Sequence, residues 1–222
     1  MGEWIDLKAL DGFVLKAWRA TPPAAPKGGV VVIQEIFGVN RHIRSVADRF
    51  AAAGYLAIAP AIFDRVEKGV EEGYDQPGRT HGMAIAGKLD REKILLDAAA
   101  AIAAAGAAGK VGIVGFCLGG SIAWIAAARL SGLSAAVGYY GGQIIATKDL
   151  QPQVPTMLHF GEKDEHIPLA GVREVGQLHP DVPIYLYPAG HGFHCDERES
   201  YDAASAALAW DRTIAFFAKH VG

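Results

Sequence analysis

The most informative part of the sequence is KVGIVGFCLGGSIAWIAAARL, residues 110–130. Up to Phe116 it is a short apolar run of strand type, and residues 121–130 have the composition of a helix. Between them stands Gly115-Phe116-Cys117-Leu118-Gly119-Gly120, which has the pattern G-x-Nu-x-G with cysteine as the candidate nucleophile. Glycines flank such a nucleophile because its backbone is strained and its packed neighbours leave no room for a Cβ. The segment therefore predicts a strand, a sharp turn that presents Cys117, and a helix whose N-terminus favours the thiolate.

The rest of the chain alternates short strand patterns with longer helical ones, which is typical of a mostly parallel sheet with crossover helices. Parallel strands are expected at 29–34, 55–59, 111–116, 135–140, 156–160 and 184–187, and residues 13–18 are expected as the second arm of a hairpin. Apolar stripes predict a helix through residues 43–50 and a last helix that begins around Ser200. We therefore expect one α/β domain over residues 1–222, with helices on both faces of the sheet. Its irregular segment 64–90 is expected to form a loop or lid.

Composition and charge exclude several classes of function. The chain has 222 residues, 51% of them hydrophobic, which is enough for the core of one large domain. A formal net charge of −3 without a Lys/Arg cluster argues against nucleic acid or an anionic membrane as a partner. The uncharged run 111–128 is broken by Gly119-Gly120-Ser121, so it is expected to be a buried strand and helix. The opening residues carry no secretion signal, and two cysteines make no disulfide framework. We expect a cytoplasmic protein that is a monomer or a weak homodimer.

Three chemically active side chains follow the ends of three predicted strands. Cys117 follows the strand 111–116, Asp164 follows 156–160, and His191 follows 184–187. Because chemistry collects at the carboxyl ends of strands in an open parallel sheet, we expect these side chains to converge. Their order along the chain, nucleophile then acid then histidine, is that of α/β-hydrolases. In this interpretation the thiolate of Cys117 attacks a carbonyl carbon, His191 takes and returns the proton, and Asp164 fixes the imidazole tautomer. No cofactor is needed for this chemistry.

Two neighbouring segments complete the predicted site. Gln34-Glu35-Ile36-Phe37-Gly38 lies at the end of the first parallel strand, where such folds hold an oxyanion donor, so the backbone amides of Ile36 and Leu118 are the expected donors. His194 competes with His191 for the role of base, and His191 is preferred because it directly follows a strand. Residues 191–197 also hold several groups that bind metals, but they lack a second well-spaced ligand pair, so no metal site is predicted.

Four segments together resemble the dienelactone hydrolase family of α/β-hydrolases. They are residues 34–38, 115–120, 161–168 and 189–191. The resemblance implies a carboxymethylenebutenolidase-type enzyme, which opens a small unsaturated lactone during the breakdown of (chloro)aromatic compounds. Glu35 matches a glutamate that interacts with the family's cysteine. The resemblance therefore also implies that Glu35 helps to deprotonate Cys117 when the substrate carboxylate arrives. A resting thiol that only the substrate activates would be protected from oxidation.

The resemblance leaves the substrate open at two places. Four residues after the catalytic histidine, the family's dienelactone enzymes carry an arginine that grips the substrate carboxylate, and Cys195 stands there in this chain. A carboxylate needs a bidentate arginine partner, so Arg198 and Arg79 are the candidates for binding the substrate carboxylate. Phe37 is also expected to bind the substrate. Residues 79–85 also lack the aromatic character that the family's pocket implies.

Three other interpretations use the same cysteine. An esterase or thioesterase with a different range of substrates would have the same triad. A class I amidotransferase-like protein also carries a cysteine elbow, but it needs a His-x-Glu pair late in the chain, and His194-Cys195-Asp196 ends in aspartate. A thiol redox sensor would oxidise Cys117, with Cys195 as one conceivable partner, although the geometry that a disulfide requires is not visible in sequence. The simpler interpretation of Cys195 is an ordinary loop thiol.

Overall fold

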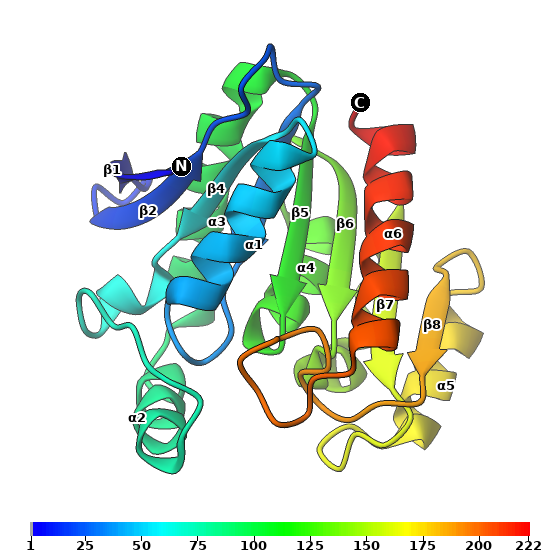
Figure 1. Ribbon diagram of the computed structural model, residues 1–222. Helices are drawn as coiled ribbons and strands as arrows, with labels where there is room; N and C mark the ends of the chain where they lie inside the picture. Colours follow the sequence, from blue (N-terminus) through cyan, green and yellow to red (C-terminus); the bar gives the residue numbers. More distant parts are fainter. Residues whose placement is uncertain (1) are drawn as a thin grey trace.

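The structure is a computed structural model, and it describes residues 2–222. An eight-stranded sheet forms the centre, in the order β1-β2-β4-β3-β5-β6-β7-β8 (Figure 1). The strands are β1 Glu3–Lys8, β2 Val14–Ala20, β3 Gly29–Ile33, β4 Leu56–Pro60, β5 Val111–Phe116, β6 Leu133–Tyr139, β7 Thr156–Gly161 and β8 Ile184–Tyr187. The helices are α1 Arg41–Ala52, α2 Gln76–Ala86, α3 Arg91–Ala105, α4 Leu118–Arg129, α5 Leu169–Leu178 and α6 Ala203–His220, with 3-10 helices η1 Ile62–Arg65, η2 Gly106–Ala108 and η3 Gly142–Thr147.

The sheet is parallel except at one side. β1 pairs with β2, and β2 with β4, in antiparallel fashion, whereas every pair from β4 across to β8 is parallel. Figure 1 shows α1 and α6 on one face of the sheet and α3, α4 and α5 on the other. Parallel strands place their carboxyl ends at the same edge, so the segments that follow β3, β5, β6, β7 and β8 meet there. The prediction of a mostly parallel sheet with helices on both faces is confirmed.

The apolar residues whose spacing predicted these strands and helices are mostly buried in the core. The central strands β3, β5 and β7 are buried along their whole length, as expected for strands covered on both faces. The predicted stripe of α1, which consists of Ile43, Val46, Ala47 and Phe50, is fully buried. On α6, Phe217 is fully buried, and Trp210 and Ile214 are half-buried against the same core.

Two expectations about local structure were wrong. The last helix begins at Ala203 rather than around Ser200, because Asp202 caps it by accepting a hydrogen bond from the amide of Ser205 at 2.8 Å. The segment 64–90 is not wholly irregular, since it contains α2. The carboxylate of Asp75 caps α2 by accepting from the amide of Gly78 at 2.9 Å, and a proline in its first turn suits a helix start. Figure 1 shows α2 at the end of the molecule toward which β5 and β6 point.

Within residues 2–222, none of the helices combines the length and the apolar character needed to cross a membrane.

Candidate active site

The elbow between β5 and α4 holds Cys117 in a strained conformation. Its φ is 54° and its ψ is −113°, outside the regions that non-glycine residues prefer. Such a conformation costs about 1–3 kcal/mol and persists where the surroundings enforce it. The surroundings are tight here: a Cβ on Gly115 would clash with the carbonyl oxygen of Gly119, and one on Gly119 would clash with that of Ile33. The two glycines therefore let the turn close, and Cys117 at this turn lines a cavity.

A chain of hydrogen bonds links the three side chains that the sequence singled out. The Nε2 atom of His191 lies 3.2 Å from the Sγ atom of Cys117, and its Nδ1 atom lies 2.7 Å from Oδ2 of Asp164. The other carboxylate oxygen of Asp164 accepts from the backbone amides of His166 at 2.8 Å and Ile167 at 3.2 Å. Since a carboxylate only accepts, Nδ1 of His191 carries the proton of this bond, and Nε2 is left to receive the thiol proton.

Asp164 and His191 each stabilise the charged form of the other. Burial raises the pKa of the Asp164 carboxyl, but the hydrogen bond and charge of His191 outweigh burial and lower it. Burial likewise lowers the pKa of His191, and its bonds to Asp164 and Cys117 outweigh that effect and raise the pKa to about 10. His191 can therefore hold a second proton at neutral pH. The structure brings His191 to Cys117, and it does not bring His194 there.

His194 instead lies in the core. Its side chain is buried, its ring stacks on Phe116 at 5.1 Å between centroids, and within residues 2–222 neither ring nitrogen has a hydrogen-bond partner. Burial lowers the pKa of His194 well below its ordinary value, so this imidazole is neutral.

The predicted oxyanion segment packs beside the elbow. A Cβ on Gly119 would clash with the carbonyl oxygens of Ile33 and Gln34, so the start of α4 lies directly against the end of β3. Ile36 and Leu118 line the same cavity as Cys117, which has a volume of about 450 Å³. Helix α2 closes on this segment, because Gly82 leaves no space for a Cβ against the carbonyl oxygen of Ile36. The two predicted donors thus come from chain segments that flank the thiol.

Glu35 makes different contacts from those that the resemblance implied. It is fully buried; its Oε1 accepts from Nη1 of Arg198 at 3.2 Å and its Oε2 accepts from the hydroxyl of Tyr74 at 3.0 Å. Among residues 2–222, no hydrogen bond joins it to Cys117. Burial lowers the pKa of Arg198, and the charge of Glu35 outweighs burial and raises it, so the guanidinium stays charged. Glu35 thus pairs with Arg198, and its expected role toward Cys117 when a substrate carboxylate arrives stays a prediction.

The three predicted substrate-binding residues lie in the wall of the cavity. Phe37, Arg79 and Arg198 line it together with Cys117 and His191. A second cavity of about 660 Å³ shares Arg79, Arg198 and His191 with the first, and Lys163 adds another positive charge to it. Sequence reasoning missed Tyr74, Met83 and His166, which line one or both cavities. Of these, only His166 had a signal, since it stands two residues after Asp164.

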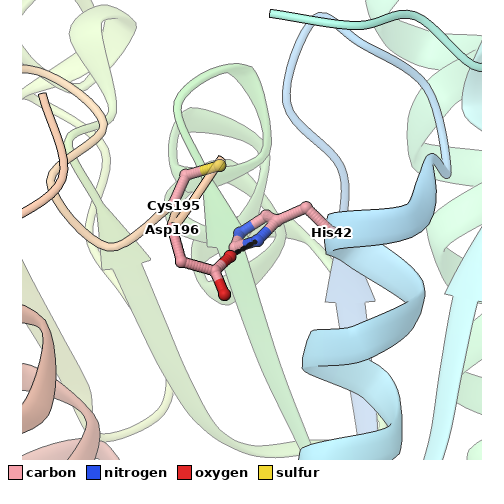
Figure 2. A group of neighbouring side chains, drawn as sticks. All are labelled: His42, Cys195 and Asp196. Carbon is pink, nitrogen blue, oxygen red and sulfur yellow. Dashed lines mark hydrogen bonds and ion pairs between the residues drawn. The ribbon is translucent and has the colours of Figure 1, made fainter. Parts of the chain in front are cut away.

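A second group of cysteine, histidine and aspartate lies beside the first site, and Figure 2 shows its members. Nδ1 of His42 lies 3.1 Å from Oδ1 of Asp196, which ties α1 to the segment before α6. Cys195 is fully buried, and burial, with the charge of Glu35 next in size, raises the pKa of its thiol to about 12. A protonated thiol without access to solvent is a poor nucleophile. Cys117 is therefore the thiol that a molecule in the cavity meets.

The fold and the site are those of an α/β-hydrolase. The sheet is mostly parallel, a nucleophile elbow follows β5, and an acid and a histidine lie beyond β7 and β8. Comparison with known proteins narrows the class. The model of the dienelactone hydrolase family matches residues 15–221, and the chain belongs to that family of hydrolases.

Known proteins are similar to this chain in sequence or structure over most of its length. A protein from Synechocystis sp. with the provisional name carboxymethylenebutenolidase is 38% identical over 208 residues, which cover 85% of this chain and 84% of the relative. The carboxymethylenebutenolidase of Pseudomonas putida is 33% identical over 227 residues, or 97% and 96% of the two chains. The crystal structure of a protein from Klebsiella pneumoniae, provisionally named a dienelactone hydrolase, superposes with a TM-score of 0.89 at 32% identity and covers 99% of each chain.

Proposed function

We propose that this chain hydrolyses a small lactone or carboxylic ester through Cys117 as the nucleophile and a covalent acyl-enzyme. The observation that carries the proposal is the hydrogen-bonded chain from Cys117 through His191 to Asp164, at 3.2 and 2.7 Å, at the wall of a cavity. Membership in the dienelactone hydrolase family supports ester or lactone bonds as the target.

In the first half of the reaction, His191 takes the proton from Cys117 at Nε2, and Asp164 steadies the resulting imidazolium. The sulfur forms a bond to the carbonyl carbon, and the carbonyl oxygen becomes an oxyanion. The backbone amides of Ile36 and Leu118 stabilise that charge. When the intermediate collapses, the bond from carbon to the ring or ester oxygen breaks. His191 returns its proton to that oxygen, and a thioester to Cys117 remains.

In the second half, a water molecule gives a proton to His191 and attacks the thioester carbon. The bond from carbon to sulfur breaks, and Cys117 leaves as a thiolate, which recovers a proton from His191. The product is a carboxylic acid, and the site returns to its starting state. No cofactor takes part in these steps.

For the substrate we propose an unsaturated lactone that bears a carboxylate. Two arginines, Arg79 and Arg198, line the cavity with Cys117, and Lys163 lies in the adjoining one. A substrate carboxylate at Arg198 would compete with Glu35 for the guanidinium. Glu35, once released, is proposed to help Cys117 lose its proton, as the family resemblance implies.

The same triad could serve an esterase or thioesterase of wider range, and one observation favours this second candidate. The wall of the cavity carries apolar side chains of modest size, among them Ile36, Met83 and Ile167, and Met83 is 60% exposed. Such a wall suits a neutral acyl chain as well as a lactone ring.

A panel of substrates tests these proposals. We expect wild-type protein to hydrolyse dienelactones faster than saturated lactones, p-nitrophenyl esters or thioesters, and Cys117→Ala to hydrolyse none of them. Cys195→Ser serves as the matched control, because it changes the other thiol. A preference for neutral esters would favour the esterase, whereas reduced protein without turnover of any acyl substrate would favour the redox sensor.

We further propose that residues 1–222 act as one domain, in the cytoplasm, as a monomer or weak homodimer. A working thiol suits a reducing compartment. Sedimentation equilibrium over a range of concentrations tests the oligomeric state, and a tight dimer at the lowest concentration would contradict it.

A further inference from the structure

Tyr140, the residue directly after β6, is held in an unusual conformation beside the reacting groups. Its φ is 37°, and within residues 2–222 the one other non-glycine residue with a positive φ is Cys117. β5 and β6 are neighbours, and the amide of Cys117 donates to the carbonyl oxygen of Tyr139 at 3.0 Å, so the two strained residues lie at the same edge of the sheet. Strain of this kind in a bulky residue points to a functional constraint.

The side chain of Tyr140 carries a donor without a partner. The residue is fully buried, and its ring centroid lies 5.1 Å from that of His191. Its hydroxyl makes no hydrogen bond within residues 2–222. The adjacent Tyr139 is equally buried, but its hydroxyl lies 2.9 Å from the carbonyl oxygen of Ala209 and 2.6 Å from Oγ1 of Thr213. Because a buried hydroxyl is normally paired, the unpaired one at Tyr140 calls for an acceptor that forms during function.

The neighbours of this hydroxyl decide which acceptor that is. Burial, followed by the charges of Glu35 and Cys195, raises the pKa of Tyr140 well above its ordinary value, so the hydroxyl keeps its proton. Glu35 already carries its charge in the resting site, where it accepts from Arg198 and Tyr74 and makes no hydrogen bond with the Tyr140 hydroxyl. Cys195 is a buried thiol that stays protonated. Cys117 lies close by as well, since its Sγ is 3.2 Å from Nε2 of His191, whose ring centroid is 5.1 Å from that of Tyr140. It is the neighbour that becomes negatively charged in the proposed reaction.

We propose that Tyr140 is a positioning residue whose hydroxyl donates a hydrogen bond to Sγ of Cys117 once the thiol has passed its proton to His191. The inference rests on the proposed role of Cys117 as nucleophile. Only one proton moves, from Sγ to Nε2 of His191, and the phenol keeps its own. Tyr140 does not line the cavity with Cys117, so it stabilises the thiolate from behind, away from the substrate.

The charged and titratable groups around this centre come from every element that packs on it. They are Glu35 after β3, Arg79 in α2, Tyr140 after β6, Asp164 and His166 after β7, His191 after β8, and Cys195 and Arg198 before α6. A change of Tyr140 to phenylalanine removes one oxygen and leaves all the others in place.

The test compares Tyr140→Phe with Tyr139→Phe. We would measure the rate at which iodoacetamide alkylates Cys117 as a function of pH, and the Tm of each variant. Loss of a hydrogen bond to a charged sulfur should move the midpoint of the alkylation profile upward by about one pH unit in Tyr140→Phe, with alkylation about tenfold slower at neutral pH. Its Tm should stay the same or rise, because the lost hydroxyl had no partner. Tyr139→Phe should lower the Tm and leave the midpoint unchanged.

Either of two results overturns the proposal: a Tyr140→Phe midpoint equal to that of wild type, or a loss of Tm in Tyr140→Phe as large as in Tyr139→Phe. Turnover separates this inference from the proposed function. If Cys117→Ala is inactive while the midpoint of Tyr140→Phe does not move, the role of Tyr140 alone is wrong. If Cys117→Ala keeps full turnover, Cys117 is not the nucleophile and both proposals fail.

Discussion

Replacing Arg198 with methionine would leave the buried carboxylate of Glu35 without its cationic partner. Glu35 is completely buried, and Arg198 is its one cationic partner in the described chain, with Nη1 at 3.2 Å from Oε1. Removing one member of a buried ion pair costs about 3–5 kcal/mol, because the other charge is left unpaired. The hydroxyl of Tyr74 still donates to the second oxygen at 3.0 Å, so we expect the lower end, about 3 kcal/mol. For a chain of this size, that corresponds to a Tm lower by roughly 6–12 °C.

The assay is urea denaturation at neutral pH, with thermal unfolding alongside it. Methionine retains an apolar stem against Phe37 and Tyr74, whose rings lie 5.7 and 5.8 Å from the guanidinium carbon, so charge changes more than volume. The double variant Glu35→Gln with Arg198→Met should recover at least half of the loss, since no unpaired charge remains. Arg41→Met is the matched control: its bond to Glu197 is exposed at the arginine, and such pairs contribute less than about 1 kcal/mol.

Two results would show that the ion pair does not stabilise the fold in this way. Arg198→Met could be as stable as Arg41→Met, or the double variant could be no more stable than Arg198→Met alone. Either would mean that Glu35 is not held as a buried anion by Arg198.

Three further predictions concern His191 and its supports. Asp164→Asn should lower kcat by about 10⁴ with little change in KM, because the amide would favour the wrong imidazole tautomer; steady-state kinetics check this, and a loss below tenfold would contradict it. Ser200→Ala removes a hydroxyl that donates to the carbonyl oxygen of His191 at 2.6 Å, so unfolding should become easier by about 0.5–1.5 kcal/mol and kcat should fall several-fold, whereas unchanged values of both would argue against the contact. The pKa of His191, lowered by burial but raised overall to about 10 by Asp164 and Cys117, lies above the ordinary 6.5, so the folded state binds more protons between these values. The contribution of His191 to stability should be complete below about pH 6.5 and disappear as the pH rises through about 10. In urea titrations, the free energies of unfolding of wild type and His191→Gln should therefore converge with rising pH. If they diverge, the predicted direction of this pH dependence is wrong.

How much of the site could be predicted follows from what each residue depends on. Cys117, Asp164 and His191 each lie within four residues of the end of a strand, so their convergence depends mainly on a parallel sheet, which the alternation of patterns predicts. Phe37 follows the end of β3, whereas Arg79 and Arg198 were predicted as candidates for the arginines that the family resemblance implies.

The remaining features depend on contacts between distant segments. The partners of Glu35 are Tyr74 and Arg198, which lie 39 and 163 residues away, and no periodicity links them to it. Helix α2 was missed because its apolar pattern is weak and its position depends on close packing of Gly82 on Ile36.

Ser200 illustrates a further limit of sequence patterns. As a serine ahead of a helical stripe it was a reasonable N-cap, but Asp202 lies nearer to the first turn and takes that role. The hydroxyl of Ser200 is thereby free to bond the carbonyl oxygen of His191. The strain and the unpaired hydroxyl of Tyr140 likewise arise from tertiary packing, which local sequence does not report.

In the proposed reaction Cys117 carries the acyl group. Acid quenching during turnover of a lactone, followed by digestion and mass spectrometry, tests it most directly, because ring opening adds the whole mass of the lactone to the attacking residue. We expect that added mass on the peptide that contains Cys117. It should be removed by hydroxylamine and be absent from Cys117→Ala. The same mass on Cys195, or hydrolysis at full rate by Cys117→Ala, would contradict this expectation.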